Sequence, residues 1–169
     1  LFRSFGLYES FDEKNGKKLN NKNWLEDATG NMRQIGLNPG LWRTLFAKSL
    51  LRELKFKSYL MAEDQLFLIE TLSKTNKISF YNKVVYTYYF GASRHLTKSS
   101  IALLDLQEAG ENALIYLQKS KLNYNRFTIE MIAYRIILSN LKYNLKYIVS
   151  CVSLVFKLAK LLKIRIFSI

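Results

Sequence analysis

The sequence has few of the residues that cross-link a chain or interrupt its secondary structure: one cysteine, Cys151, and one proline, Pro39, among 169 residues. A single cysteine cannot form a disulfide within the chain, and it excludes a metal site built from several thiolates of this chain. A reducing compartment is the simpler interpretation. Hydrophobic residues make up 49% of the composition, so we expect a folded chain and not a disordered one.

Acidic residues are also scarce, since 13 Asp and Glu face 26 Lys and Arg, for a net charge of +13. This excess indicates an anionic partner: nucleic acid, an acidic membrane face or a phosphorylated small molecule. The imbalance is strongest from Met131 onward, where the chain carries seven Lys and Arg and no acid. The first residue is Leu1 and no signal-peptide pattern follows it, so we expect a fragment of a longer protein.

Long uncharged runs are absent from the basic C-terminal part. The longest, Tyr147–Phe156, is too short to cross a bilayer, which needs about 20 apolar residues. We expect a helix over residues 144–167, with a polar stripe on an otherwise apolar cylinder. The stripe consists of Lys146, Ser150, Ser153, Lys157, Lys160 and Lys163. Such a helix suits a membrane interface, where each cation near anionic lipid contributes about 1 kcal/mol.

The remaining patterns predict alternating short elements followed by helices. Asn15-Gly16 is typical of a hairpin turn after a first strand. Hydrophobic spacing, caps and β-branched runs then predict the other elements. We expect a short helix from Asn23 to Gly30, a turn at 36–40, helices at 47–54 and 63–73, strands at 78–81 and 83–90, and helices at about 99–120 and 124–140.

Glu63 and Asp64 open the helix predicted at 63–73. Asp64 shares a helical face with Phe67 and Leu68, so its carboxylate should face the protein body. The pair alone is weak evidence of chemistry, because acids in a first helical turn gain about 0.3–1 kcal/mol in any protein. Its neighbours along the chain give it a more specific meaning.

Three motifs occur in order: Gly36-Leu37-Asn38-Pro39-Gly40-Leu41-Trp42, then Ala62-Glu63-Asp64-Gln65-Leu66-Phe67, and, after two predicted strands, Ser93-Arg94-His95-Leu96-Thr97. Together they resemble the C-terminal half of a family 2 glycosyltransferase of the GT-A fold. The resemblance covers residues 1–98 and implies an α/β fold, the acceptor side of a Rossmann-like GT-A domain. Residues 99–143 would then form a helical extension and residues 144–169 a cationic amphipathic helix.

The resemblance implies an inverting transfer of sugar from a nucleotide-sugar donor to a saccharide or glycolipid acceptor. Asp64 occupies the position of the general base, with Glu63 as its secondary neighbour. A carboxylate can take the proton of an acceptor hydroxyl as that hydroxyl attacks the anomeric carbon, and a helix start should keep it ionised. Gly36 and Gly40 match a flexible loop that precedes the acidic pair. Trp42 would stack on an acceptor sugar or serve as a core anchor.

His95 matches a histidine that, by resemblance, helps to hold a divalent metal, Mg²⁺ or Mn²⁺, on the departing diphosphate. One imidazole makes no metal site without carboxylates from elsewhere. Arg94 or Lys98 could instead contact the phosphates, or the segment is an ordinary solvated basic loop. No Asp-x-Asp occurs in the sequence, so the metal and the nucleotide would both need a preceding half. The fragment alone should be inactive.

Other functions remain alternatives. The sequence contains no phosphate loop, dinucleotide fingerprint, His-Glu-x-x-His or Gly-x-Ser-x-Gly. A basic module without catalysis could bind nucleic acid through cations and tyrosines, or bind membranes. The wide apolar face of the tail disfavours nucleic acid. A noncatalytic helical scaffold is the third reading. The glycosyltransferase hypothesis predicts a cytoplasmic enzyme in surface polysaccharide synthesis, held peripherally on the inner membrane face through residues 144–169.

Overall fold

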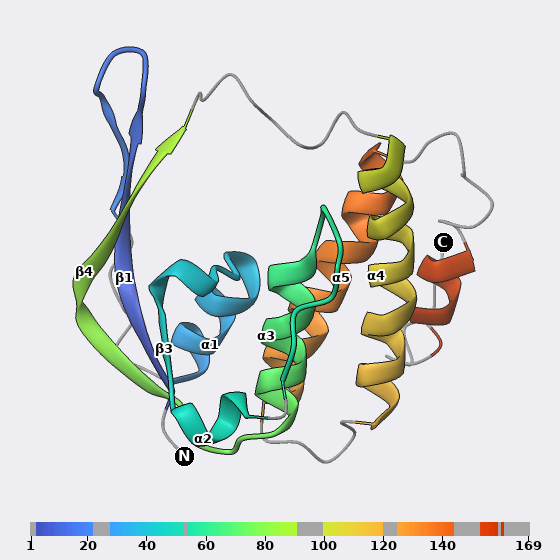
Figure 1. Cartoon of the computed structure of the whole chain (residues 1–169). Coiled ribbons are helices and arrows are strands. Elements are labelled where there is room, and N and C mark those ends of the chain that lie inside the picture. Colours follow the sequence, from blue (N-terminus) through green and yellow to red (C-terminus); the bar gives the residue numbers. More distant parts are fainter. Residues whose placement is uncertain are drawn as a thin grey trace, which may run out of the picture.

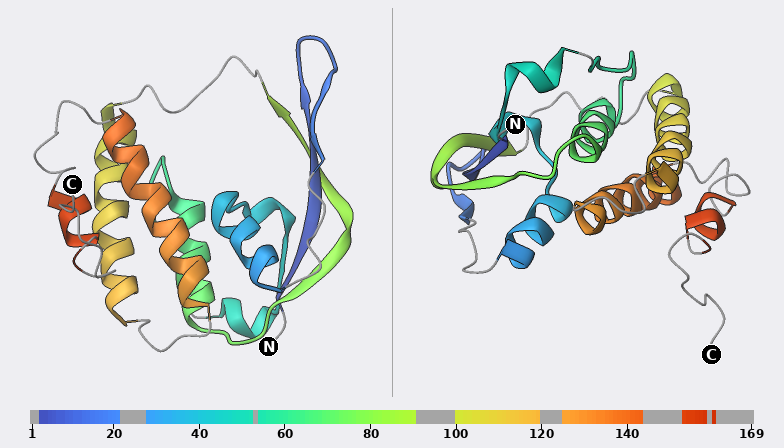
Figure 2. Two further views of the ribbon diagram at one scale, coloured as in Figure 1. Left: turned by 180° about the vertical axis from the view of Figure 1, so that it is seen from behind. Right: turned by 90° about the horizontal axis from the view of Figure 1, so that it is seen from below.

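The computed structural model describes residues 3–21, 28–52, 54–90, 100–119, 125–143, 153–158 and 160. It confirms a mixed α/β chain. A small sheet stands at one end of the molecule and the long helices stand at the other, with α1 and α3 between them (Figures 1 and 2). The described residues thus form a sheet layer, a middle layer of two helices and an outer helical layer.

Strand β1 (Arg3–Asp12) organises the sheet. Strand β2 (Lys18–Asn21) pairs antiparallel with its C-terminal part, and β3 (Thr44–Phe46) pairs antiparallel with its N-terminal part. Strand β4 (Ser79–Phe90) runs parallel to β1 along most of its length. The predicted hairpin turn is confirmed, since the Asp12 amide donates to the Lys17 carbonyl at 2.9 Å and Gly16 has a φ of +67°.

The prediction of two strands at 78–81 and 83–90 is wrong, because β4 is continuous. Its register with β1 passes from Tyr81 directly to Val84. The polar pair Asn82-Lys83 therefore interrupts the pairing as an irregularity and does not end the strand, as expected of a bulge.

The helix predicted from Asn23 to Gly30 is helical in its described part, from Ala28, but its predicted end at Gly30 is wrong. Helix α1 (Ala28–Leu37) continues through Gly30, because burial of Met32 and Ile35 offsets the roughly 1 kcal/mol cost of a helical glycine. The turn expected at 36–40 accordingly starts later. Gly36 lies in the last turn of α1, where an added Cβ would stand 2.6 Å from the Met131 Cβ.

The other helices match the hydrophobic pattern more closely. A 3₁₀ turn, η1 (Leu41–Arg43), precedes β3, and α2 (Lys48–Leu51) is shorter than the helix predicted at 47–54. Helix α3 (Glu63–Ser73) has the predicted bounds. Helices α4 (Ser100–Lys119) and α5 (Arg126–Tyr143) follow. Residues 153–158 and 160 are helical, and the rest of the predicted 144–167 helix lies outside the described residues.

The core lies where α3, α4 and α5 meet. Leu68, Ile69 and Leu72 of α3 are fully buried and belong to one cluster with the apolar faces of α4 and α5. Small residues at Ala109 and Ala113 allow the helices to approach closely. Helix α3 is therefore fixed on one side by the bundle and lies between the bundle and the sheet (Figure 1). No helix among the described residues is long and apolar enough to cross a membrane.

Candidate functional site

A cavity of about 220 Å³ lies at the N-terminal end of α3. Segments far apart in the sequence contribute to it: β1, the loop after α1, η1, α3, β4 and α5. Its lining residues are Tyr8, Asn38, Pro39, Trp42, Asp64, Gln65, Tyr88 and Arg135. The cavity thus brings together Asp64 and Trp42, which the sequence places in two separate motifs.

The chain enters α3 through an unusual backbone conformation. Ala62 has φ +63° and ψ 11°, in the left-handed region, and provides no side-chain cap. A residue with a Cβ pays roughly 1–2 kcal/mol there. The carbonyl of Ala62 accepts the first helical hydrogen bond, from the Leu66 amide at 3.0 Å. This sharp entry sets Asp64 in the first turn, where its Oδ1 accepts from the Gln65 amide at 2.7 Å.

Burial, followed by the neighbouring carboxylate of Glu63, raises the pKa of Asp64 from 3.8 to about 6. Backbone amides and the positive charge of Arg135 act in the opposite direction. The expectation that the helix start keeps Asp64 ionised holds only above about pH 6, since desolvation outweighs the helix dipole. At neutral pH the carboxylate is mostly ionised and retains a useful affinity for a proton.

Aromatic rings line the same cavity as Asp64. The Trp42 ring lies 4.8 Å from Tyr8 in an edge-on arrangement, and 4.7 Å and 5.8 Å from Tyr86 and Tyr88 in tilted ones. Gly40 makes room for this ring, because an added Cβ would stand 2.5 Å from Trp42 Cε2. Gly40 thus positions the tryptophan by its lack of a side chain, and it does not line the cavity.

Arg43 holds the loop that carries Trp42. Its side chain is buried, donates to the Asn38 carbonyl at 2.7 Å and lies 5.3 Å from the centre of the Tyr8 ring. Burial lowers its pKa to about 10, so it stays charged at neutral pH. The Thr44 hydroxyl adds a bond to the Gly40 carbonyl at 3.1 Å. These two hydrogen bonds tie the loop to η1 and β3, and the expectation of a flexible glycine loop stays a prediction.

The other predicted site residues are placed differently. Glu63 neighbours Asp64 and affects its pKa but does not line the cavity. Gly36 lines a separate cavity against α5. Arg94, His95 and Lys98 lie outside the described residues, so the predicted phosphate and metal contacts remain predictions.

The donor set for a metal is incomplete in the described part of the chain. No group of three or more His, Cys, Asp or Glu side chains comes together there, and the cavity contains one carboxylate, Asp64. A divalent ion with a closed shell needs more oxygen or nitrogen ligands than this.

Of the residues that line the cavity, only Asp64 and Trp42 were predicted as site residues. Asn38, Pro39 and Gln65 lie in the same motifs without a predicted role, and Tyr8, Tyr88 and Arg135 lie outside the motifs. The sequence pattern around Tyr8 and Tyr88 is that of ordinary strand residues. In the parallel pairing of β1 with β4, Tyr8 lies opposite Tyr86, two residues before Tyr88, and both Tyr8 and Tyr88 contact Trp42. Arg135 looked like one cation of a basic tail. Only the packing of α5 against α1 and α3 brings it to the cavity, and no local sequence pattern reports that packing.

No family model, no curated protein and no solved structure matches this chain.

Proposed function

We propose that the chain is the acceptor-side part of an inverting glycosyltransferase that uses a nucleotide-sugar donor. Asp64 is the general base. The acceptor hydroxyl gives its proton to the Asp64 carboxylate while its oxygen bonds to the anomeric carbon of the donor sugar. The bond from that carbon to the donor phosphate breaks, and the nucleoside diphosphate leaves with the electron pair. Inversion follows because attack and departure occur on opposite faces.

One observation carries this proposal: a partly buried carboxylate with a pKa of about 6 lies in a cavity that aromatic rings also line. A general base works best when its pKa lies near the working pH. Aromatic side chains offer the broad apolar faces on which a ring-shaped ligand can lie. Asn38 and Gln65 add amide groups beside the carboxylate, suited to hydroxyl groups of a saccharide.

The donor side of the reaction belongs to residues outside the described cavity. A preceding half of the enzyme, together with Arg94, His95 and Lys98, would hold the nucleotide and a divalent ion. The net charge of +13 supports a phosphorylated substrate and peripheral contact of residues 144–169 with the anionic inner face of the membrane.

The test is Asp64→Asn in the complete gene product, assayed by nucleoside diphosphate release from a panel of nucleotide sugars and saccharide acceptors. We expect a loss of about 10²- to 10⁴-fold in kcat, the usual contribution of a general base. Glu111→Gln is the matched control, because Glu111 is an exposed carboxylate on α4 that does not line the cavity, and it should retain activity within about threefold. Unchanged transfer in a folded Asp64→Asn enzyme would remove Asp64 as the base.

A further inference from the structure

A second, larger cavity runs along helix α5 and touches the end of α1, with a volume of about 450 Å³. Apolar and aromatic side chains share it with two cations. It is lined by Gly36, Leu37, Met131, Tyr134, Arg135, Leu138, Ser139, Lys142 and Tyr143. Leu37, Tyr134 and Leu138 are 48%, 49% and 41% exposed, so this apolar surface is open to solvent along the described part of the chain.

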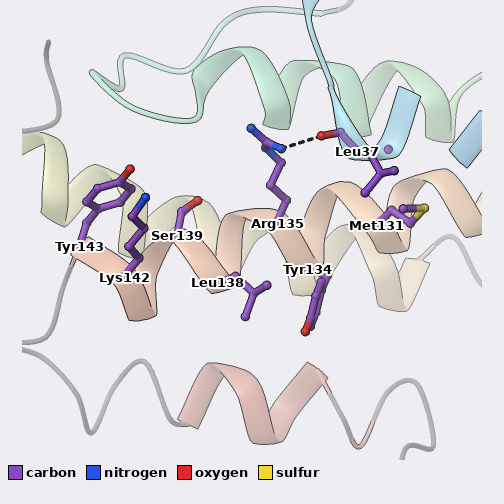
Figure 3. A pocket seen from close by; sticks show the side chains of 9 residues that line it. Leu37, Met131, Tyr134, Arg135, Leu138, Ser139, Lys142 and Tyr143 are labelled. Carbon is purple, nitrogen blue, oxygen red and sulfur yellow. Dashed lines mark hydrogen bonds between the residues drawn. The ribbon is translucent and has the colours of Figure 1, made fainter. Parts of the chain in front are cut away.

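Both cations of the groove lie on one side of α5. In Figure 3 the side chains of Arg135 and Lys142 extend from α5 on the side of Leu37, together with Ser139 and Tyr143, whereas Tyr134 and Leu138 extend on the opposite side. Arg135 gives one N–H to the Leu37 carbonyl at 2.6 Å. A guanidinium has five such donors, so this bond orients it and leaves others for a ligand. No acidic side chain lines the groove among the residues that the structure describes.

Arg135 also lines the cavity of Asp64. A single guanidinium thus stands where the carboxylate and aromatic site meets the apolar groove. From the first cavity to the second, a ligand would meet the Asp64 carboxylate with its aromatic neighbours, then the Arg135 guanidinium, and then the apolar and cationic side chains of the α5 groove. A ligand that complements it has a saccharide at one end, a phosphate in the middle and a hydrocarbon chain at the other end.

We propose that the acceptor of this glycosyltransferase is a phosphate-linked glycolipid, with its sugar at Asp64, its phosphate at Arg135 and Lys142, and the first part of its lipid chain in the α5 groove. The inference rests on the proposed function and specifies the acceptor class. Two observations favour this occupant: the cationic side of the groove complements a phosphate, and the groove is continuous with the candidate site through Arg135. A guanidinium and an ammonium bind phosphate oxygens through charge-assisted hydrogen bonds.

The experiment measures equilibrium binding of dodecyl phosphate, below its micelle concentration, to the complete gene product. Dodecyl maltoside, which has the same chain without charge, and inorganic phosphate, which has the charge without a chain, are the comparison ligands. We expect dodecyl phosphate to bind at least about tenfold more tightly than either. Equal affinity for inorganic phosphate would show an ordinary anion site and overturn the lipid assignment. Equal affinity for dodecyl maltoside would overturn the phosphate assignment.

Variants locate the binding. Arg135→Gln and Lys142→Gln should each weaken dodecyl phosphate binding by about tenfold, and Lys119→Gln, an exposed cation at the end of α4, should not change it. Lys142→Gln keeps the test valid if loss of the Arg135 bond to Leu37 disturbs folding. Unchanged affinity in both groove variants would overturn the proposal.

Asp64→Asn separates this inference from the proposed function, because binding of dodecyl phosphate does not need the base. Retained binding with lost transfer supports both. Retained binding with unchanged transfer removes Asp64 as the base while the groove assignment stands, and transfer to soluble saccharides without dodecyl phosphate binding removes the glycolipid alone.

Discussion

The two ends of helix α3 are built in opposite ways. At its C-terminal end the Asn125 amide, fully buried, donates to the Leu72 carbonyl at 2.9 Å and to the Thr75 carbonyl. The Ser73 hydroxyl donates to the Glu70 carbonyl at 2.6 Å. At its N-terminal end, Ala62 is left-handed and provides no side-chain cap. Asp64, two residues on, carries a charge that burial disfavours.

The difference shows where this fold tolerates unfavourable local interactions. Strained backbone and desolvated charge persist only when the surrounding structure determines them, and they concentrate at functional sites. Here the buried side of α3 and its satisfied C-terminal end fix the helix in the bundle. The first turn is consequently held against the cavity even though its own interactions do not favour it.

The largest expected effect is at the satisfied end. Asn125→Ala leaves the Leu72 and Thr75 carbonyls without this donor inside the core, and each such loss costs about 1–3 kcal/mol. We expect the free energy of unfolding to fall by about 2–3 kcal/mol, measured by urea denaturation.

The matched control is Asn112→Ala on α4. Asn112 also makes two amide hydrogen bonds, to the Tyr59 hydroxyl at 3.1 Å and the Glu108 carbonyl at 3.0 Å, but at partly exposed positions. Water can replace them, so the loss should stay below about 1 kcal/mol. Similar losses in the two variants would mean that Asn125 does not anchor the helix end.

An intermediate effect is expected from Asp64→Asn on stability. Because burial raises the pKa of Asp64 from 3.8 to about 6, the folded state holds the proton more tightly than the unfolded state. The associated stability is fully present below about pH 4 and is lost as the pH rises through about 6. Two pKa units correspond to about 3 kcal/mol, and partial exposure reduces this to about 1–2 kcal/mol.

Asparagine does not titrate, so the variant should be more stable than the parent by about 1–2 kcal/mol at pH 7 and equal to it near pH 4. Urea denaturation at the two pH values measures both. A variant that loses stability at pH 7 would show that the carboxylate is favourably solvated, and the contrast between the helix ends would disappear. Gain of stability with loss of transfer is the signature of a functional residue.

The sequence predicts the helix that carries this site and two of its residues, but not the residues that tertiary packing brings to it. Apolar spacing and first-turn acids give α3 its correct bounds, and the order of motifs pairs Asp64 with Trp42, which share the cavity. Glycine usually marks turns, which predicts a loop at Gly36, yet Gly36 lies in α1 and permits contact with Met131. Arg135 enters the cavity through helix packing, which depends on contacts between residues about a hundred positions apart, such as its bond to Leu37. The pattern around the third motif makes predictions only for residues outside the described part.

The left-handed conformation at Ala62 is not marked by a glycine in the sequence. A substitution at Ala62 should have the smallest effect on the free energy of unfolding. Ala62→Gly relieves about 1–2 kcal/mol of backbone strain but loses a buried methyl group and adds freedom to the unfolded chain, which together cost a similar amount. The free energy of unfolding should therefore change by less than about 0.5 kcal/mol. Ala109→Gly in the middle of α4, also buried, has no strain to relieve and should lose about 1–2 kcal/mol. Equal losses at the two positions, measured by urea denaturation, would mean that Ala62 is unstrained, and the buried charge of Asp64 alone would then distinguish the two ends of the helix.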